Sequence, residues 1–213
     1  MALRLNGQTT GYTELNAPAN GDSVVLTMPG NDGTSGQYLQ TDGSGGLSWA
    51  TPTTPAVYTS GTTQSLNTET SVIVTGIPSN AIRVFVSLQD VSWAATANLR
   101  FMLGTSSGIV STNYSATGNS IYGSGTLAGN STTSFQLALA TSASHSFHGH
   151  IEISLVDTND YILTSNLHNT NTSYSSFVGG RVQLGGVLER FEMTVSTSSF
   201  DSGQFRVDYL TQS

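Results

Sequence analysis

The chain has 213 residues, only 9% of which are charged, and its formal net charge is −7 at pH 7. Its six basic residues are all arginines and are scattered, so they cannot form the basic stripe that nucleic acid binding requires. The chain has no cysteine and no window approaching about 18 apolar residues, so disulfides and thiolate metal sites are excluded and we expect no membrane insertion.

Residues 1–50 are rich in turn signals and contain only short apolar runs. Strands are predicted over residues 12–15 and 23–28, and a hairpin over residues 37–49 is predicted to turn at Asp42-Gly43. Such short elements cannot bury a core of their own. We therefore interpret this segment as an attachment or oligomerisation module, with a solvated tail as the alternative. Its candidate docking residues are Tyr12, Leu26, Leu39 and Trp49.

Residues 51–56 contain two prolines and are predicted to be an extended linker. Beyond it, residues 57–213 open with two strands, residues 71–75 and 82–88, which we interpret as a central pair around a turn at Pro78. Further strands are predicted over residues 98–103, 134–139, 145–156, 160–164, 180–184, 190–195 and 204–209. The Ser-, Thr-, Gly- and Asn-rich residues 104–131 carry no predicted strand. These patterns predict an all-β fold, an antiparallel β-sandwich of jelly-roll type.

Several motifs occur in an order that resembles virion structural proteins of tailed bacteriophages. In the first segment they are Gly11-Tyr12-Thr13-Glu14-Leu15-Asn16-Ala17-Pro18, Val25-Leu26-Thr27-Met28-Pro29, Gly36-Gln37-Tyr38-Leu39-Gln40-Thr41-Asp42-Gly43 and Leu47-Ser48-Trp49. In the second they are Val74-Thr75-Gly76-Ile77-Pro78, residues 107–114 and residues 200–207. The chain is thus similar to short tail-fibre and head-fibre proteins of phages that infect aquatic bacteria.

This resemblance implies a homotrimer on the outer surface of the virion. Its N-terminus would dock to phage capsid or tail proteins, and its distal domain would adsorb to the host surface, with a surface glycan as the partner. The chain lacks the long repetitive shaft of a long tail fibre. A small knob, or a capsid decoration protein that stabilises the shell, therefore fits its length.

The acidic residues are mostly single and close to predicted turns. A glycan depolymerase needs two facing carboxylates, and a serine hydrolase of the Gly-x-Ser-x-Gly type needs a motif that the chain lacks. We therefore expect no enzymatic activity and no cofactor, with a small depolymerase as a minor alternative.

His148 and His150 lie two residues apart on a predicted strand, so both side chains face the same side. If this strand lay near the axis of a trimer, three copies of the pair would suit an octahedral transition-metal site. An exposed polar strand face is the alternative interpretation.

Aromatic residues in loop-rich regions are candidates for receptor binding, because rings with polar neighbours stack on sugars. They are Trp93, Tyr114, Tyr122 and Tyr174. For Trp93 and Tyr114, a place at the end of the sandwich core is the alternative. Phe85 interrupts the polar face of its strand and is a candidate for a subunit interface.

Overall fold

The computed structural model describes residues 3–6, 10, 12–15, 25–53, 55–123 and 125–212. The chain divides into two compact units, Met1–Thr53 and Thr54–Ser213. The described part of the second unit is an all-β fold of antiparallel sheets, as the sequence predicts. The described residues form no helix long and apolar enough to cross a membrane.

The first unit contains two small hairpins. β1 (Leu3–Asn6) pairs with β2 (Tyr12–Leu15), and β3 (Tyr38–Thr41) pairs with β4 (Leu47–Ala50). The strand predicted over residues 23–28 is not formed within residues 25–28, where only Thr27 makes an isolated bridge to Gly46; residues 23 and 24 lie outside the described residues.

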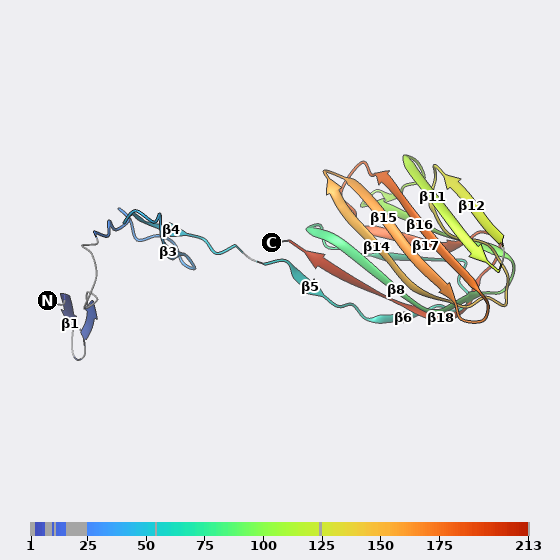
Figure 1. Ribbon diagram of the computed structural model, residues 1–213, viewed down its shortest axis with the longest axis horizontal. Helices are drawn as coiled ribbons and strands as arrows, with labels where there is room; N and C mark the ends of the chain where they lie inside the picture. The colour runs from blue at the N-terminus through green and yellow to red at the C-terminus, as the bar shows by residue number, and fades with distance from the viewer. Residues whose placement is uncertain are drawn as a thin grey trace. The chain divides into compact units, whose positions relative to one another are not determined.

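The second unit is a sandwich of two sheets, shown in Figure 1. The smaller sheet has the order β10-β9-β17-β7, and β13 also pairs with β9. Its strands are β7 (Ser71–Thr75), β9 (Ala97–Thr105), β10 (Gly108–Ile109), β13 (Phe135–Thr141) and β17 (Arg190–Val195).

The larger sheet has the order β12-β11-β16-β15-β14-β8-β18-β5, and β6 also pairs with β18. Its strands are β5 (Val57–Thr59), β6 (Thr63–Ser65), β8 (Ala81–Trp93), β11 (Tyr114–Tyr122), β12 (Gly125–Ser131), β14 (Phe147–Asp157), β15 (Asp160–Asn169), β16 (Tyr174–Gln183) and β18 (Phe200–Thr211). Figure 1 shows β14, β15, β16, β11 and β12 side by side.

Alternation of apolar and polar residues builds the larger sheet as expected. In β8, Val84, Val86 and Leu88 are buried, whereas Arg83 between them and the turn is exposed. In β14, Phe147, Ile151 and Ile153 are buried. Every second side chain of these strands therefore points into one core, which the two sheets share.

The interpretation of residues 71–75 and 82–88 as a central pair is wrong. β7 lies at the edge of the smaller sheet and pairs with β17, whereas β8 lies inside the larger sheet between β14 and β18. Between them Gly76 adopts a positive φ of 80°, and the amide of buried Ile77 donates to the carbonyl of Glu189 at 3.1 Å. The turn thus carries the chain from one sheet to the other.

Residues 104–131 also depart from the prediction, because they contain three strands, β10, β11 and β12. β11 pairs along its whole length with β16 and forms a hairpin with β12. This hairpin extends the larger sheet to its edge and leads directly to the candidate site.

Candidate functional site

Two tyrosines face each other across neighbouring strands at one end of the sandwich. Tyr122 is the last residue of β11, Tyr174 is the first residue of β16, and the two are direct partners in the antiparallel register. Their rings are stacked, with centroids 6.3 Å apart and planes 18° from parallel. Adjacent pairs of this kind are the basic unit of side-chain contact on a sheet face.

The strand period places both tyrosine rings on the inward face of the sheet. Ser120 and Ser176 lie on the inward face one step deeper, are buried, and share a hydrogen bond of 3.1 Å. Tyr174 is only 4% exposed, whereas Tyr122 is 44% exposed. The hydroxyl of Tyr174 accepts from the Leu139 amide and donates to the Leu139 carbonyl, which anchors its ring to β13.

Hydrogen bonds between loops form the wall around this pair. The side-chain amide of Asn171 donates to the Ser144 carbonyl at 3.0 Å, and the Thr170 amide donates to the Ser146 carbonyl at 2.8 Å. The Gly123 amide donates to the Ser173 carbonyl at 3.2 Å. The loops that follow β11, β13 and β15 are therefore held together beside the tyrosine pair.

A side-chain turn orients the loop after β15. The Oδ1 atom of Asn169 accepts from the backbone amides of Asn171 and Thr172, at 2.6 and 3.0 Å. Asparagine stabilises turns in this way by replacing a backbone acceptor. The turn presents Thr172 and Ser173 at the edge of the pocket.

The imidazole ring of His145 lies beside the ring of Tyr174, and the two ring centroids are 5.2 Å apart. Its Nδ1 atom accepts from the Ser142 backbone amide at 3.3 Å. In the neutral ring the proton is therefore on Nε2, which is left as a donor. Burial lowers the pKa of His145 below its ordinary value of 6.5, so this neutral form prevails at neutral pH.

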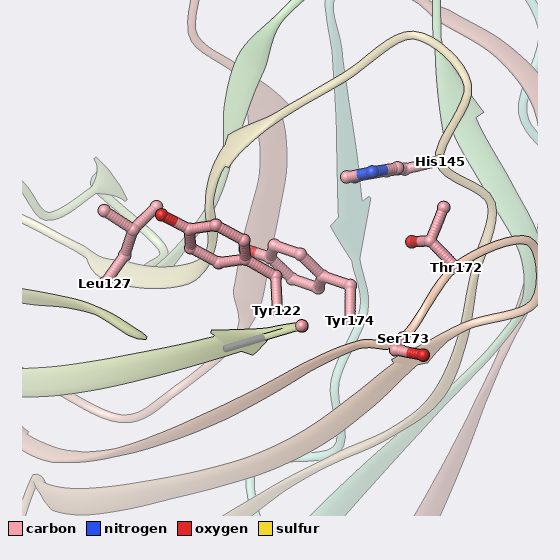
Figure 2. Close-up of a pocket in the computed structure, with 7 residues that line it drawn as sticks. Tyr122, Leu127, His145, Thr172, Ser173 and Tyr174 are labelled. Atoms are coloured by element: carbon pink, nitrogen blue, oxygen red, sulfur yellow. The ribbon is translucent and has the colours of Figure 1, made fainter. Parts of the chain in front are cut away.

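Together these groups line a pocket of about 620 Å³, a volume within the range of small-molecule sites. Figure 2 shows the tyrosine rings with Leu127 on one side and with His145 and Thr172 on the other. The described lining residues are Tyr122, Gly123, Leu127, His145, Thr172, Ser173 and Tyr174. The described lining contains no carboxylate and no arginine, so the pocket is suited to an uncharged ligand with an apolar face.

Two of the four predicted receptor residues thus meet in one pocket, and the other two do not. Trp93 is fully buried and stacks on Phe147, with centroids 5.3 Å apart. Tyr114 is 4% exposed, and its hydroxyl donates to the Val110 carbonyl and accepts from the Leu103 amide. Burial raises the pKa of Tyr114 to about 12. Both rings belong to the core. Their assignment as receptor residues is therefore wrong, and the alternative interpretation, a place in the sandwich core, is correct.

The predicted metal residues, His148 and His150, are exposed on β14. The ring nearest to His148 is that of His168, its direct partner on β15, at a centroid distance of 6.1 Å. No group of three or more histidine or acidic side chains suited to a metal ion occurs among the described residues. A site that joins three chains at His148 and His150 stays a prediction.

Phe85 is half-buried in β8, and its ring lies 6.4 Å from that of Tyr58. Its assignment to a subunit interface stays a prediction. In the first unit, Leu26 and Leu39 are 58% and 42% exposed, as a docking role requires. Trp49 is half-buried against Gly33, and the side chain of Tyr12 lies outside the described residues.

Sequence reasoning missed the pocket roles of His145, Leu127, Thr172 and Ser173. A usable signal was present, since the polar runs around His145 and Thr172 each connect two strands of an antiparallel fold. Comparison of the chain with protein-family models, curated proteins and solved structures found no match.

Proposed function

We propose that the chain is a non-enzymatic adsorption protein on the outer surface of a phage virion, and that its sandwich binds host-surface carbohydrate. The observation that carries the proposal is the pocket around Tyr122 and Tyr174, which combines an accessible ring with hydroxyl groups and an imidazole. Aromatic rings with polar tips suit ligands that are apolar on one face and hydrated at the rim. The virion origin is supported by the order of the fibre-like motifs in the sequence.

Binding fits the pocket better than hydrolysis does. Cleavage of a glycosidic bond requires a pair of carboxyl groups on either side of the bond. None of the described lining residues is aspartate or glutamate. The depolymerase alternative would therefore need a different site.

The first unit is proposed to attach the protein to the particle. Five of its apolar side chains are 42–78% exposed, a large share for so small a unit. They are Val25, Leu26, Met28, Tyr38 and Leu39. In the assembled particle, other copies of the chain, or a capsid or tail protein, would bury these side chains.

The test of the binding function is an array of surface glycans probed with the full-length protein. We expect binding to at least one glycan and loss of that binding in Tyr122→Ala. Binding that persists in this variant would contradict the assignment of the pocket.

Two further measurements test the assembly. Light scattering of the full-length protein should give about three times 22.3 kDa if the chain is a trimer. The copy number in purified particles separates the two places in the virion: a few dozen chains or fewer indicate a tail appendage, and several hundred indicate capsid decoration.

A further inference from the structure

Several polar groups of the pocket have no hydrogen-bond partner among the described residues. Among the described residues, no hydrogen bond is made by the hydroxyls of Tyr122, Thr172 or Ser173. The Nε2–H of His145 is likewise left without an acceptor, because only Nδ1 is engaged. These groups can all bond to hydroxyls of a ligand, since a hydroxyl both donates and accepts.

The two rings form a platform and not a clamp. A sugar ring held between two aromatic rings needs about 7–8 Å between them, twice an ordinary carbon–carbon contact distance. Tyr122 and Tyr174 are only 6.3 Å apart, and Tyr174 is buried. The accessible surface is therefore the Tyr122 ring, which lies so close to Gly125 that a Cβ there would be 2.9 Å from Cζ of Tyr122.

The charges elsewhere in the protein disfavour an acidic ligand. Three of the five arginines whose side chains the structure describes are paired with carboxylates: Arg83 with Glu152, Arg181 with Asp160, and Arg206 with Asp208. A fourth, Arg190, donates to the Ser106 carbonyl at 3.1 Å. With a net charge of −7 and no cation in the described lining, the protein would repel polyanions.

We propose that the pocket selects an uncharged pyranose, whose apolar face stacks on Tyr122 and whose hydroxyls bond to His145 Nε2–H, Thr172 and Ser173. This inference rests on the proposed carbohydrate-binding function and narrows it to neutral sugars. Uronic acids, sialic acids and phosphorylated sugars are rejected, because their charge would be desolvated without a partner.

The experiment measures retardation of the full-length protein in native gels that contain a polysaccharide. The neutral probes are dextran, yeast mannan and galactan, and the acidic probes are polygalacturonate and polysialic acid. We expect at least one neutral polymer to retard the protein and neither acidic polymer to do so.

Variants tie the retardation to the pocket. Tyr122→Ala should weaken binding of the retarding polymer about tenfold, the effect of losing a ring contact of about 1.4 kcal/mol. Tyr122→Phe keeps the ring and should lose only about threefold. Gly125→Ala displaces the ring without removing it, so its loss should fall between these two. The matched control is Phe177→Ala, because Phe177 is 43% exposed and does not line the pocket.

The outcomes separate the two proposals. Retardation by an acidic polymer that Tyr122→Ala abolishes would overturn the neutral selectivity and leave the binding function standing. Retardation by none of the five polymers would overturn both. Retardation that Phe177→Ala and Tyr122→Ala reduce equally would overturn the pocket as the site. An unchanged melting temperature of the variants shows that loss of binding is not loss of fold.

Discussion

The two units of the chain reach order by different means. The sandwich buries aromatic and aliphatic side chains from both sheets in one continuous core. In residues 25–53, by contrast, no side chain is buried. Burial is the main favourable term in folding, so the sandwich has a core that can specify its fold, whereas we expect residues 25–53 to depend on contacts beyond themselves.

Local hydrogen bonds, and not a core, hold residues 25–53 together. The carboxylate of Asp42 accepts from the amides of Ser44 and Gly46, at 2.7 and 2.9 Å. The Trp49 indole donates to the Asn31 carbonyl at 2.8 Å, and its ring covers Gly33. Exposed hydrogen bonds add little net stability, about 1 kcal/mol or less each. Such a unit suits a segment that becomes fully stable on assembly.

The chain has two tryptophans, one in each unit, and they give the largest expected contrast. Trp93→Ala should lower the free energy of unfolding of the sandwich by about 3–5 kcal/mol, because it empties a fully buried site against Phe147 and Phe200. Trp49→Ala should leave it unchanged. Urea unfolding followed by circular dichroism measures both.

A smaller loss of stability is expected where the last strand, β18, contacts the segment between β5 and β6. Asp208 is 2% exposed, accepts from the Gly61 amide and the Ser60 hydroxyl, and is paired with Arg206 at 3.1 Å. Asp208→Ala should cost about 1–3 kcal/mol, because it leaves these donors without their acceptor. Ser106→Ala, at an exposed turn of the same unit, is the control.

The same carboxyl group determines how the stability of the sandwich changes as the pH falls. Desolvation acts to raise the pKa of Asp208, but the hydrogen bonds from Tyr58, Gly61, Arg206 and Ser60 together outweigh it and hold the pKa below 3.8. The stability from this group is therefore present above pH 3.8 and is lost as the pH falls through the lower folded value. Asp208→Ala should flatten the decline below pH 4; an unchanged decline would contradict the assignment.

The difference between predicted and missed strands has a physical cause. β8 and β14 were predicted because their inward residues are large and apolar. β11 has no such pattern, because between Tyr114 and Tyr122 its inward residues are the small Ala116, Gly118 and Ser120. A Cβ on Gly118 would lie 3.0 Å from the Gln136 carbonyl oxygen of the facing strand β13, so the sheets approach too closely for larger side chains. Hydropathy patterns do not record how close two sheets lie.

The candidate site could be predicted in part for a related reason. Tyr122 and Tyr174 were recognised singly as rings with polar neighbours. They form a pair because β11 and β16 are aligned in a particular register. The alternation within each strand does not predict how the two strands are aligned with each other. The loop that carries His145 is brought beside them by loop–loop hydrogen bonds such as that from Asn171 to Ser144, which the sequence pattern does not show.

The pH dependence of His145 should be weaker than that of Asp208 and confined to a milder range. Burial lowers its pKa, so as the pH falls below 6.5 the unfolded chain takes up this proton before the folded one does. Stability should therefore fall as the pH drops below 6.5, and less so in His145→Gln. The nearest titratable group, the Tyr174 phenol, has a raised pKa and stays neutral in this range.

Thermal unfolding at pH 7.5 and 5.5 checks this. The difference between the two melting temperatures should be larger for the natural chain than for His145→Gln. Equal differences would show that burial does not lower the pKa of His145 in the folded protein.

The smallest expected effect is the most direct test of the contrast between the units. Deletion of residues 1–53 should leave the melting temperature of the sandwich within about 2 °C, because every residue of its core cluster lies beyond position 65. The deletion should also remove attachment to the particle, since the exposed apolar side chains of residues 25–39 go with it. If residues 54–213 fail to fold, the sandwich is not autonomous, and the first unit must contribute contacts that residues 25–53, none of which is buried, give no reason to expect.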